Sequence, residues 1–358
     1  MKINHTHFRL FLLGFVAFLL LPNSGFCQDP HFSQFYASPL NLNPALAGSS
    51  SGNYRVSVNY RDQWRGALDN SLKTFGASGD LKYLLNDKQN RPDIAAGGFM
   101  FFSDQVGDFD LNTNQIALVG AYHKSLSQNF DNYLGIGVQL GIIQKSINYE
   151  DLFFQDQFNA IDGFDQSTGE LLPANNFAFL DFAVGLNYSI SPIKGRQYYA
   201  GLSYAHLTSP NISFYKSDES PDPDLIKENV LHAKLTGYVG SSIKTSEVLE
   251  VQPRALFLNQ GPHTEVNLGT NFRYKLLEKE NTYIHFGPWL RFVQNEKGFG
   301  VESIVFSAGY EIKNFILGLS YDHSIGDLVS DRKGLNALEI SISYLGEVEN
   351  NDGFCPTF

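Results

Sequence analysis

The stretch Asn53-Tyr54-Arg55-Val56-Ser57-Val58-Asn59-Tyr60-Arg61 alternates strictly between polar and apolar side chains. Its even positions carry Tyr, Val, Val and Tyr, and its odd positions carry Asn, Arg, Ser, Asn and Arg. Because successive side chains of a strand point to opposite faces, this stretch predicts a strand with one apolar and one strongly polar face. The same alternation returns in 264–275 and again in 336–345.

About fourteen segments of the chain show this period, and their boundaries carry an error of about two to four residues. An even number of antiparallel strands is what single-chain outer-membrane barrels require. The sequence therefore predicts an all-β fold, a transmembrane outer-membrane β-barrel of about 14 antiparallel strands. The predicted strands are 53–61, 72–84, 93–102, 113–124, 132–144, 177–190, 197–207, 230–240, 248–258, 264–275, 282–293, 300–311, 314–323 and 336–345.

A soluble β-sandwich would show the same period, but it would bury the apolar faces and expose the polar ones. The barrel is favoured by an export leader, by long loops after the fifth and seventh predicted strands (145–176 and 208–229), and by aromatic residues near strand ends. Aromatic girdles mark both interfaces of such barrels. The predicted girdle residues include Tyr54, Tyr60, Phe177, Tyr188, Phe315 and Tyr321.

The leader begins with Lys2 and Arg9 around an apolar stretch that is too short to span a bilayer, which is typical of a cleaved secretory signal. Cleavage is expected after Cys27; a lipoprotein use of Cys27 is the alternative. We find no composition break that would mark a second globular domain. The predicted organisation is a signal peptide at 1–27, a periplasmic strap or plug at 28–52, the barrel at 53–345 and a short tail at 346–358.

The composition excludes several classes of protein. Charged residues make up 18% of the 358 residues and aromatic residues 14%, which is unlike the surface of an ordinary soluble enzyme. The formal charge of −11 argues against a nucleic-acid partner, since phosphate binding needs a basic face. Beyond the leader no run of about 18 apolar residues occurs, so a helical membrane protein is disfavoured.

We expect no catalytic site, no cofactor and no metal site, and therefore not an enzyme. The glycine-rich stretch 135–141 lies on a predicted strand and lacks the spacing of a nucleotide fingerprint. The scattered histidines form no zinc-binding motif. The acidic residues of 151–170 form either a solvated face or a Ca²⁺ site with oxygen ligands.

Charged residues on the polar faces are expected to point into the lumen. On the lipid face an Arg or Lys near mid-bilayer would cost about 2–4 kcal/mol, so the register is strongly specified. Such charges either stiffen the barrel through paired contacts or line a pathway for ions or solutes. The predicted lumen-facing charges include Arg55, Arg61, Asp80, Arg273, Arg291 and Asp322.

The block QDPHFSQFYASPLNLNPALAG at 28–48, followed by Tyr-Arg-Asp-Gln-Trp-Arg at 60–65, resembles the start of the PorP/SprF family. Further resemblance lies in 103–107 and 318–322. The family comprises membrane proteins of the type IX secretion system and gliding machinery of Bacteroidetes. The resemblance implies an outer-membrane barrel that helps to export or anchor surface proteins such as adhesins. The implied partners are outer-membrane lipid, periplasmic components of the system and a secreted surface adhesin.

The N-terminal block is expected to act as a plug or strap, as a docking peptide for periplasmic components, or as both. The outer loops are expected to contact the secreted protein. The partner-binding candidates are Phe32, Gln34, Phe35, Tyr36, Asn43, Pro44, Gln63, Trp64, Asp156 and Asp165.

The predicted barrel is too narrow for folded cargo. Its strand count implies a lumen of about 15–18 Å, whereas a folded domain of about 100 residues is well over 30 Å wide. We therefore expect an accessory component of the secretion machinery. A diffusion pore or small-ligand transporter is the alternative function.

Overall fold

The computed structural model describes residues 29–85, 92–107, 110–127, 131–149, 152–159, 163–170, 172–215, 229–277, 281–295, 298–326 and 334–346. The predicted signal peptide and the tail beyond Gly346 lie outside these residues.

The described residues contain fourteen strands, and each predicted strand overlaps one of them. The strands are β1 (Tyr54–Gln63), β2 (Leu72–Leu85), β3 (Asp93–Val106), β4 (Leu111–Ser125), β5 (Asp131–Ser146), β6 (Asn176–Ile193), β7 (Arg196–Ala205), β8 (Lys234–Lys244), β9 (Leu249–Gln260), β10 (His263–Leu277), β11 (Thr282–Asn295), β12 (Gly298–Ile312), β13 (Phe315–Ser324) and β14 (Ala337–Gly346). The short helices are η1 (Phe35–Ala37), α2 (Pro39–Leu42), η2 (Pro44–Leu46) and η3 (Gln155–Gln157).

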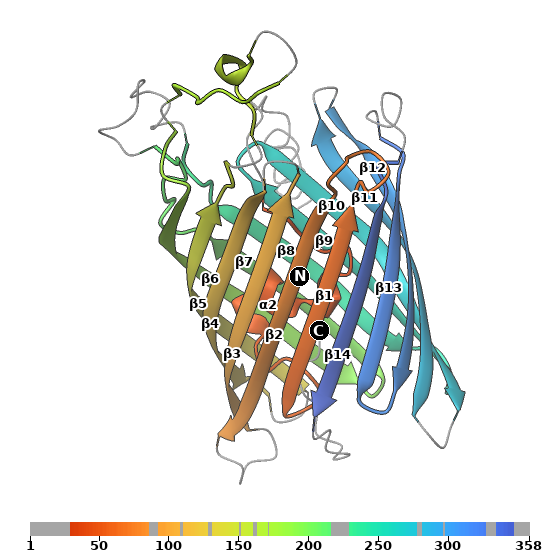
Figure 1. Cartoon of the computed structure of the whole chain (residues 1–358). Coiled ribbons are helices and arrows are strands. Elements are labelled where there is room, and N and C mark those ends of the chain that lie inside the picture. Colours follow the sequence, from red (N-terminus) through yellow and green to blue (C-terminus); the bar gives the residue numbers. More distant parts are fainter. Residues whose placement is uncertain are drawn as a thin grey trace, which may run out of the picture.

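The sheet closes on itself as a barrel (Figure 1). Each strand pairs antiparallel with its neighbours in sequence, and β1 pairs with β14, with Arg61 opposite Glu339. Closure leaves no strand edge unpaired, which a barrel in lipid requires because the hydrocarbon offers no hydrogen bonds. The prediction of an all-β barrel with 14 antiparallel strands is confirmed.

The outward and inward faces of the strands follow the alternation in the sequence. In β5 the apolar residues Ile136, Val138 and Leu140 are exposed on the outside, whereas Tyr133 and Gln139 are buried on the inside. Side chains exposed in this way are the ones that meet hydrocarbon in an outer-membrane barrel. None of the described helices has the length and apolar character needed to cross a membrane.

The two long connections, 147–175 after β5 and 206–233 after β7, lie at the same end of the barrel (Figure 1). We call this the outer end, because long loops of outer-membrane barrels face the outside. The opposite end carries Tyr54 and Gly346, and we call it the inner end.

Two local predictions were wrong. Phe177 does not join the aromatic girdle, because it lies in the inward register of β6 and its ring packs at 5.0 Å against that of Phe214 in the outer loop. Residues 230–233 do not belong to β8, which begins at Lys234; Val230 instead pairs with Asn211 within the loop.

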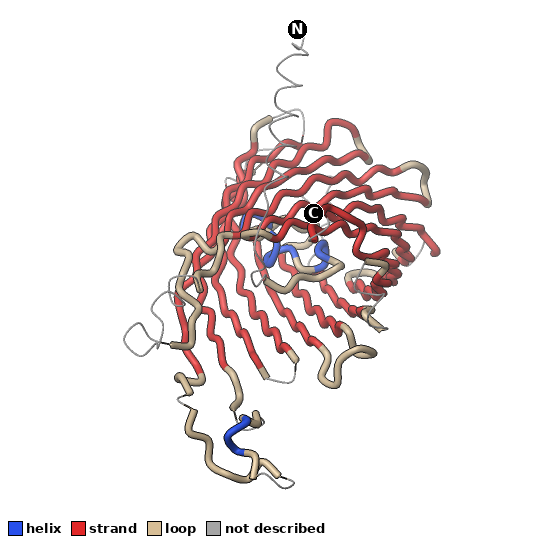
Figure 2. The backbone as a smooth tube through the Cα atoms, turned by 90° about the horizontal axis from the view of Figure 1, so that it is seen from above, coloured by secondary structure: helices blue, strands red, loops and turns tan. Residues whose placement is uncertain are grey.

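The core of the protein lies inside the barrel, where residues 29–52 fill space between the walls. Figure 2 shows the short helices of this segment within the ring of strands. Pro39 begins α2 and Pro44 begins η2, positions at which the missing N–H of proline is not needed. The side chain of Asn43 caps η2 by accepting a hydrogen bond from Ala45 N.

Candidate functional site: the lumen segment and its cavities

Residues 29–52, which we call the lumen segment, run through the barrel from the outer end to the inner end. At the outer end Asp29 N donates to Oε1 of Gln260, the last residue of β9, at 2.8 Å. At the inner end Asn53 N donates to Gly346 O at 2.9 Å. The sequence predicts this segment on the periplasmic side, as a strap or plug. The structure instead extends it along the whole lumen, because its polar groups find partners on the inner wall at every level.

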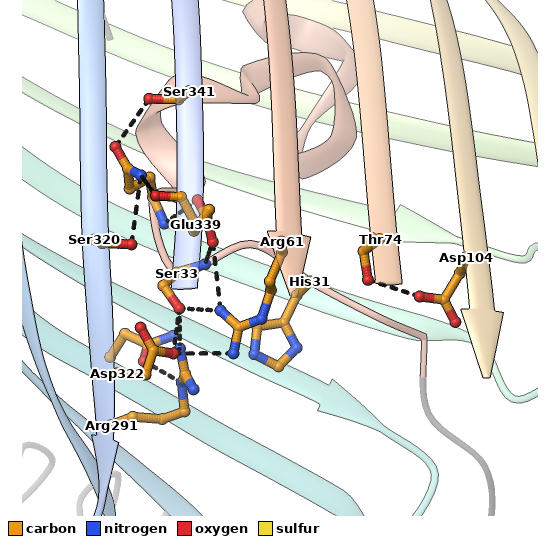
Figure 3. A network of polar contacts seen from close by, with 12 residues as sticks. His31, Ser33, Arg61, Thr74, Asp104, Arg291, Ser320, Asp322, Glu339 and Ser341 are labelled. Atoms are coloured by element: carbon orange, nitrogen blue, oxygen red, sulfur yellow. Dashed lines mark hydrogen bonds and ion pairs between the residues drawn. The ribbon is translucent and has the colours of Figure 1, made fainter. Parts of the chain in front are cut away.

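The lumen segment meets a buried polar network in the outer half of the barrel (Figure 3). The Ser33 hydroxyl donates to Asp322 Oδ2 at 2.5 Å and accepts hydrogen bonds from Arg61 Nη1 and from Arg291 Nη2. Ser33 N and Gln34 N donate to the two carboxylate oxygens of Glu339, at 2.7 and 2.9 Å. The segment thus adds neutral groups to charges that belong to the wall.

The wall charges of this network compensate one another. Arg61 lies 2.9 Å from Asp322 and 3.4 Å from Glu339, and Arg291 lies 3.0 Å from Asp322. All four side chains are almost completely buried. Buried charges are tolerated only when they are paired and hydrogen-bonded, so the network holds β1, β11, β13 and β14 together as well as the segment.

In the middle of the barrel the segment lies against glycines. Asn43 Nδ2 donates to Leu186 O at 3.0 Å and to Leu202 O at 3.2 Å. A Cβ atom added at Gly137 would lie 2.3 Å from Ala45 N, closer than real Cβ contacts allow. Gly137 therefore lets the backbone of the segment approach the wall.

An aromatic cluster packs the segment against the opposite wall. The Phe35 ring meets the Trp289 ring edge-on at 5.3 Å, and the Tyr36 ring stacks on Trp289 at 5.8 Å. The guanidinium of Arg254 lies 5.0 Å from the centre of the Tyr36 ring and donates to Tyr199 Oη at 2.6 Å. Aromatic pairs of this kind add to the free energy of burial, by about 0.5–1.5 kcal/mol each.

Near the inner end the segment is held by charge-assisted hydrogen bonds. Arg55 Nε donates to Asp80 Oδ1 at 2.9 Å, and Arg55 Nη2 donates to Leu46 O at 3.0 Å. Asp80 also accepts from Gly48 N at 2.8 Å. Hydrogen bonds to ionised groups are about twice as strong as neutral ones, so this end of the segment is firmly attached.

The outer end of the segment is anchored by one carboxylate. Asp29 Oδ2 lies 2.6 Å from His206 Nε2 and 2.9 Å from Lys234 Nζ, and His206 Nδ1 lies 2.9 Å from Asp181. Burial disfavours the charged imidazole, but the carboxylates of Asp29 and Asp181 outweigh it and raise the pKa of His206 to about 9. Burial likewise opposes ionisation of Asp29, yet Lys234 and His206 hold the pKa of Asp29 well below its usual range. His206 begins the loop 206–233 and Lys234 directly follows it, so Asp29 links the segment to both ends of that loop.

Two cavities lie beside the segment, one toward each end of the barrel. The inner cavity, of about 480 Å³, is lined by Tyr36, Arg254 and Arg273 among others. The outer cavity, of about 470 Å³, is lined by Asp29, Trp64 and residues of β3, β4 and β5 among others. Between them the segment is fully buried at Ala45 and Leu46. The segment thus lies between the two cavities.

The model of the family of type IX secretion system membrane proteins PorP/SprF matches residues 24–344. The chain belongs to the PorP/SprF family. It is an outer-membrane β-barrel and a membrane component of the type IX secretion system, as its sequence predicted. A comparison with curated proteins finds no match.

Solved barrels resemble this PorP/SprF protein in fold. The CymD monoaromatic hydrocarbon channel is 12% identical with a TM-score of 0.46, over 86% of this chain and 92% of that one. The toluene transporter TbuX of Ralstonia pickettii is 10% identical with a TM-score of 0.45, over 86% and 92%. A FadL homologue of Pseudomonas aeruginosa is 13% identical with a TM-score of 0.44, over 86% and 94%.

The structure of this PorP/SprF protein places the predicted lumen-facing charges on the inner wall. Arg55, Arg61, Asp80, Arg291 and Asp322 are buried there and ion-paired. Arg273 lines the inner cavity, with Nη2 at 2.7 Å from Glu311 and Nη1 at 3.1 Å from Glu250.

The predicted partner-binding residues divide into three groups. The first group is buried or half-buried along the lumen and holds the segment in place. Gln63 and Trp64 line the outer cavity instead. Asp156 and Asp165 are exposed in the outer loop, where Asp156 accepts a hydrogen bond from Gly169 N at 2.6 Å. The first group consists of Phe32, Gln34, Phe35, Tyr36, Asn43 and Pro44.

The alternative of a Ca²⁺ site in the outer loop concerns acidic residues that the structure describes only in part. Among the described residues, no three His, Cys, Asp or Glu side chains are grouped as a metal ion would need. Asp151 and Asp162, which belonged to the predicted acidic run, lie outside the described residues.

Sequence reasoning missed the anchor formed by Asp29, His206 and Asp181. These residues are far apart in the chain, and no motif joins them. The alternation gave no indication of it, since the inward positions of β7 are odd-numbered and His206 follows the strand at an even position, with a positive φ of 58°.

Proposed function

We propose that this protein is a non-enzymatic accessory component of the type IX secretion and gliding machinery, which holds or anchors a secreted surface protein such as an adhesin. Its outer loops contact the secreted protein. Its inner turns contact periplasmic components of the machinery. The protein is not the conduit for its client.

The observation that carries this proposal is the lumen segment. Ala45 and Leu46 are fully buried between the walls, and the buried network around Arg61 attaches the outer part of the segment to the wall. Even without the segment, a lumen of about 15–18 Å would exclude a folded domain. A role outside the lumen therefore fits the structure better than transport through it.

The outer loop after β5 supports a contact role because it exposes a cluster of rings. Phe153, Phe158 and Phe164 are 72%, 42% and 47% exposed. The Phe164 ring lies 5.7 Å from that of Phe153 and 5.2 Å from that of Phe158. Exposed apolar patches on a loop commonly mark protein interaction sites, and aromatic residues contribute strongly to binding there.

The test is recovery of partners with an affinity-tagged full-length protein, cross-linked in cells and purified from the outer membrane in detergent. The wild type is expected to recover a secreted surface protein together with type IX components. A variant with Phe153, Phe158 and Phe164 changed to Ser is expected to be present in the membrane at the wild-type level but no longer to recover the surface protein. Leu126→Ser, at an exposed apolar position at the inner end, is the control and is expected to recover the surface protein as the wild type does. Equal recovery by wild type and the loop variant would overturn the loop assignment, and recovery of no secretion component would overturn the function.

A diffusion pore is the second candidate, and the two cavities favour it. They supply space at both ends of the lumen, and the segment lies between them. Steady single-channel conductance of the purified wild-type protein in planar bilayers would support the pore. Conductance confined to variants that dislodge the segment would support the accessory role.

A further inference from the structure

Asp104 is the exception among the buried acidic residues of the described chain. Seven others lie within 4.0 Å of a basic nitrogen: Asp62, Asp80, Asp93, Asp181, Glu265, Asp322 and Glu339. Asp104 is 7% exposed, and no ion pair to it occurs among the described residues. Its only hydrogen bond there comes from the Thr74 hydroxyl, at 2.7 Å (Figure 3). A buried carboxylate that no basic group contacts directly is costly, so it favours a cation that arrives from outside.

Asp104 faces the outer cavity, whose other acidic side chains are already paired. Four acidic side chains line it, and three of them already have a basic partner within 4.0 Å, which leaves Asp104 as the acidic group open to a further cation. Lys145 lines the same cavity two strands away from Asp104 and its charge attracts the carboxylate, but no ion pair within 4.0 Å joins the two among the described residues. The acidic residues are Asp29, Asp104, Glu265 and Glu302, and the basic ones are Lys145, Arg291, His31 and His263.

The walls of the cavity around Asp104 are apolar. Val106, Leu111, Ile143 and Phe179 line it, and Trp64 lies on the same cavity. This pairing of one carboxylate with apolar walls matches a side chain that carries a cation on an aliphatic stem, as lysine and arginine do. A bare metal ion is a poorer fit, since no group of three ligands forms among the described residues.

We propose that the outer cavity binds a lysine or arginine side chain of a secreted polypeptide, with its cationic head on the Asp104 carboxylate. This inference rests on the proposed function, because it names the chemistry by which the outer face recognises its client. The aliphatic stem lies along Leu111 and Ile143. The motif Ser103-Asp104-Gln105-Val106-Gly107 thereby supplies a recognition residue as well as the end of a strand.

The experiment is calorimetric titration of the full-length protein in detergent with an acetylated and amidated pentapeptide, Gly-Leu-Lys-Leu-Gly. The same peptide with norleucine in place of lysine is the matched ligand, and putrescine represents a free cationic solute. The wild type is expected to bind the lysine peptide at least about tenfold more tightly than the norleucine peptide, as a charge-assisted hydrogen bond provides. Binding is also expected to change the emission of Trp64, since the other tryptophan of the chain, Trp289, is buried against the segment.

Two variants with opposite expected effects separate recognition from structure. Asp104→Asn keeps an acceptor for Thr74 but removes the charge, so the affinity for the lysine peptide is expected to fall about tenfold. Lys145→Met removes a repulsive charge, so the affinity is expected to rise. Asp93→Asn is the control at the other end of the same strand, and it should leave the affinity unchanged.

Equal binding of the lysine peptide by wild type and Asp104→Asn would overturn the proposal, since Asp104 would then be a structural residue. Binding of putrescine as tight as that of the peptide would also overturn it, because the cavity would then take a solute. These outcomes leave the partner-recovery test untouched. Conversely, failure to recover any secretion component would overturn the proposed function whatever the titrations show.

Discussion

Asn43 occupies the space that a side chain at Gly185 would need. A Cβ atom added at Gly185 would lie 1.8 Å from Asn43 Oδ1. Asn43 belongs to the lumen segment and Gly185 to β6, so the absence of a side chain on the wall sets the position of the segment. The inward-facing glycine therefore has a packing role in addition to its place in the strand.

The variant Gly185→Val is expected to dislodge the lumen segment. The added side chain overlaps Asn43, and overpacking of a core typically costs about 1–3 kcal/mol. We expect a lower free energy of unfolding in urea and ion conductance in planar bilayers. Gly120→Val is the control, because the nearest atom to a Cβ there is 4.0 Å away, on the side chain of Val138. An unchanged conductance and stability for Gly185→Val would show that the segment does not depend on this contact.

The variant Arg61→Met is expected to destabilise the protein strongly. It leaves Glu339 without its basic partner and removes one of the two partners of Asp322 in a buried site. Breaking a buried ion pair costs about 3–5 kcal/mol. Arg65→Met is the comparison, since Arg65 is 77% exposed and its pair with Asp62 should contribute less than about 1 kcal/mol. Urea unfolding of the two variants side by side measures the difference, and equal losses would contradict the assigned role of the network.

The variant Val138→Arg tests which face of the sheet meets lipid. Val138 is 56% exposed on the outer face, midway along β5. An arginine on the lipid face near mid-bilayer costs about 2–4 kcal/mol. We expect a lower level of folded protein in the outer membrane, measured by heat-modifiable migration in gels. Phe153→Arg, in the outer loop, should have no such effect. A normal level for Val138→Arg would mean that this face does not contact hydrocarbon.

The anchor at His206 predicts a pH dependence. The folded-state pKa of His206 is raised from 6.5 to about 9. The stabilisation of the folded state by the charged imidazole is therefore complete below pH 6.5 and is lost as the pH rises through 9. The variant His206→Asn removes the charge and suits the positive φ of 58° at this position. We expect the free energy of unfolding of the wild type to exceed that of the variant by roughly 2–3 kcal/mol at pH 6, and this difference to shrink at pH 9.5. The free energy of unfolding of both proteins, measured at the two pH values, checks this. A gap independent of pH would exclude a charged His206.

The strands could be predicted because their pattern is local. Lipid outside and a polar lumen inside impose a period of two on every membrane-spanning strand, as in 53–61. This period can be recognised in the sequence without knowledge of any tertiary contact. The inward position of Arg61 and Asp322 follows from the same period. Phe177 was misplaced because an aromatic ring near a strand end is not by itself evidence of the outer face; only its register decides this.

The amino-acid sequence alone determined the closed antiparallel barrel, its polar interior and the family of the protein. The barrel and its interior follow from the alternation of polar and apolar residues, and the family follows from contiguous motifs. Tertiary structure alone decided the path of the lumen segment, the anchor between Asp29 and His206, and the isolation of Asp104. The segment has no periodicity, and its partners are distant in the chain: the amide of Asn43 bonds to Leu186 across 143 positions. Contacts of that kind depend on how a closed wall brings strands together, which no local pattern encodes.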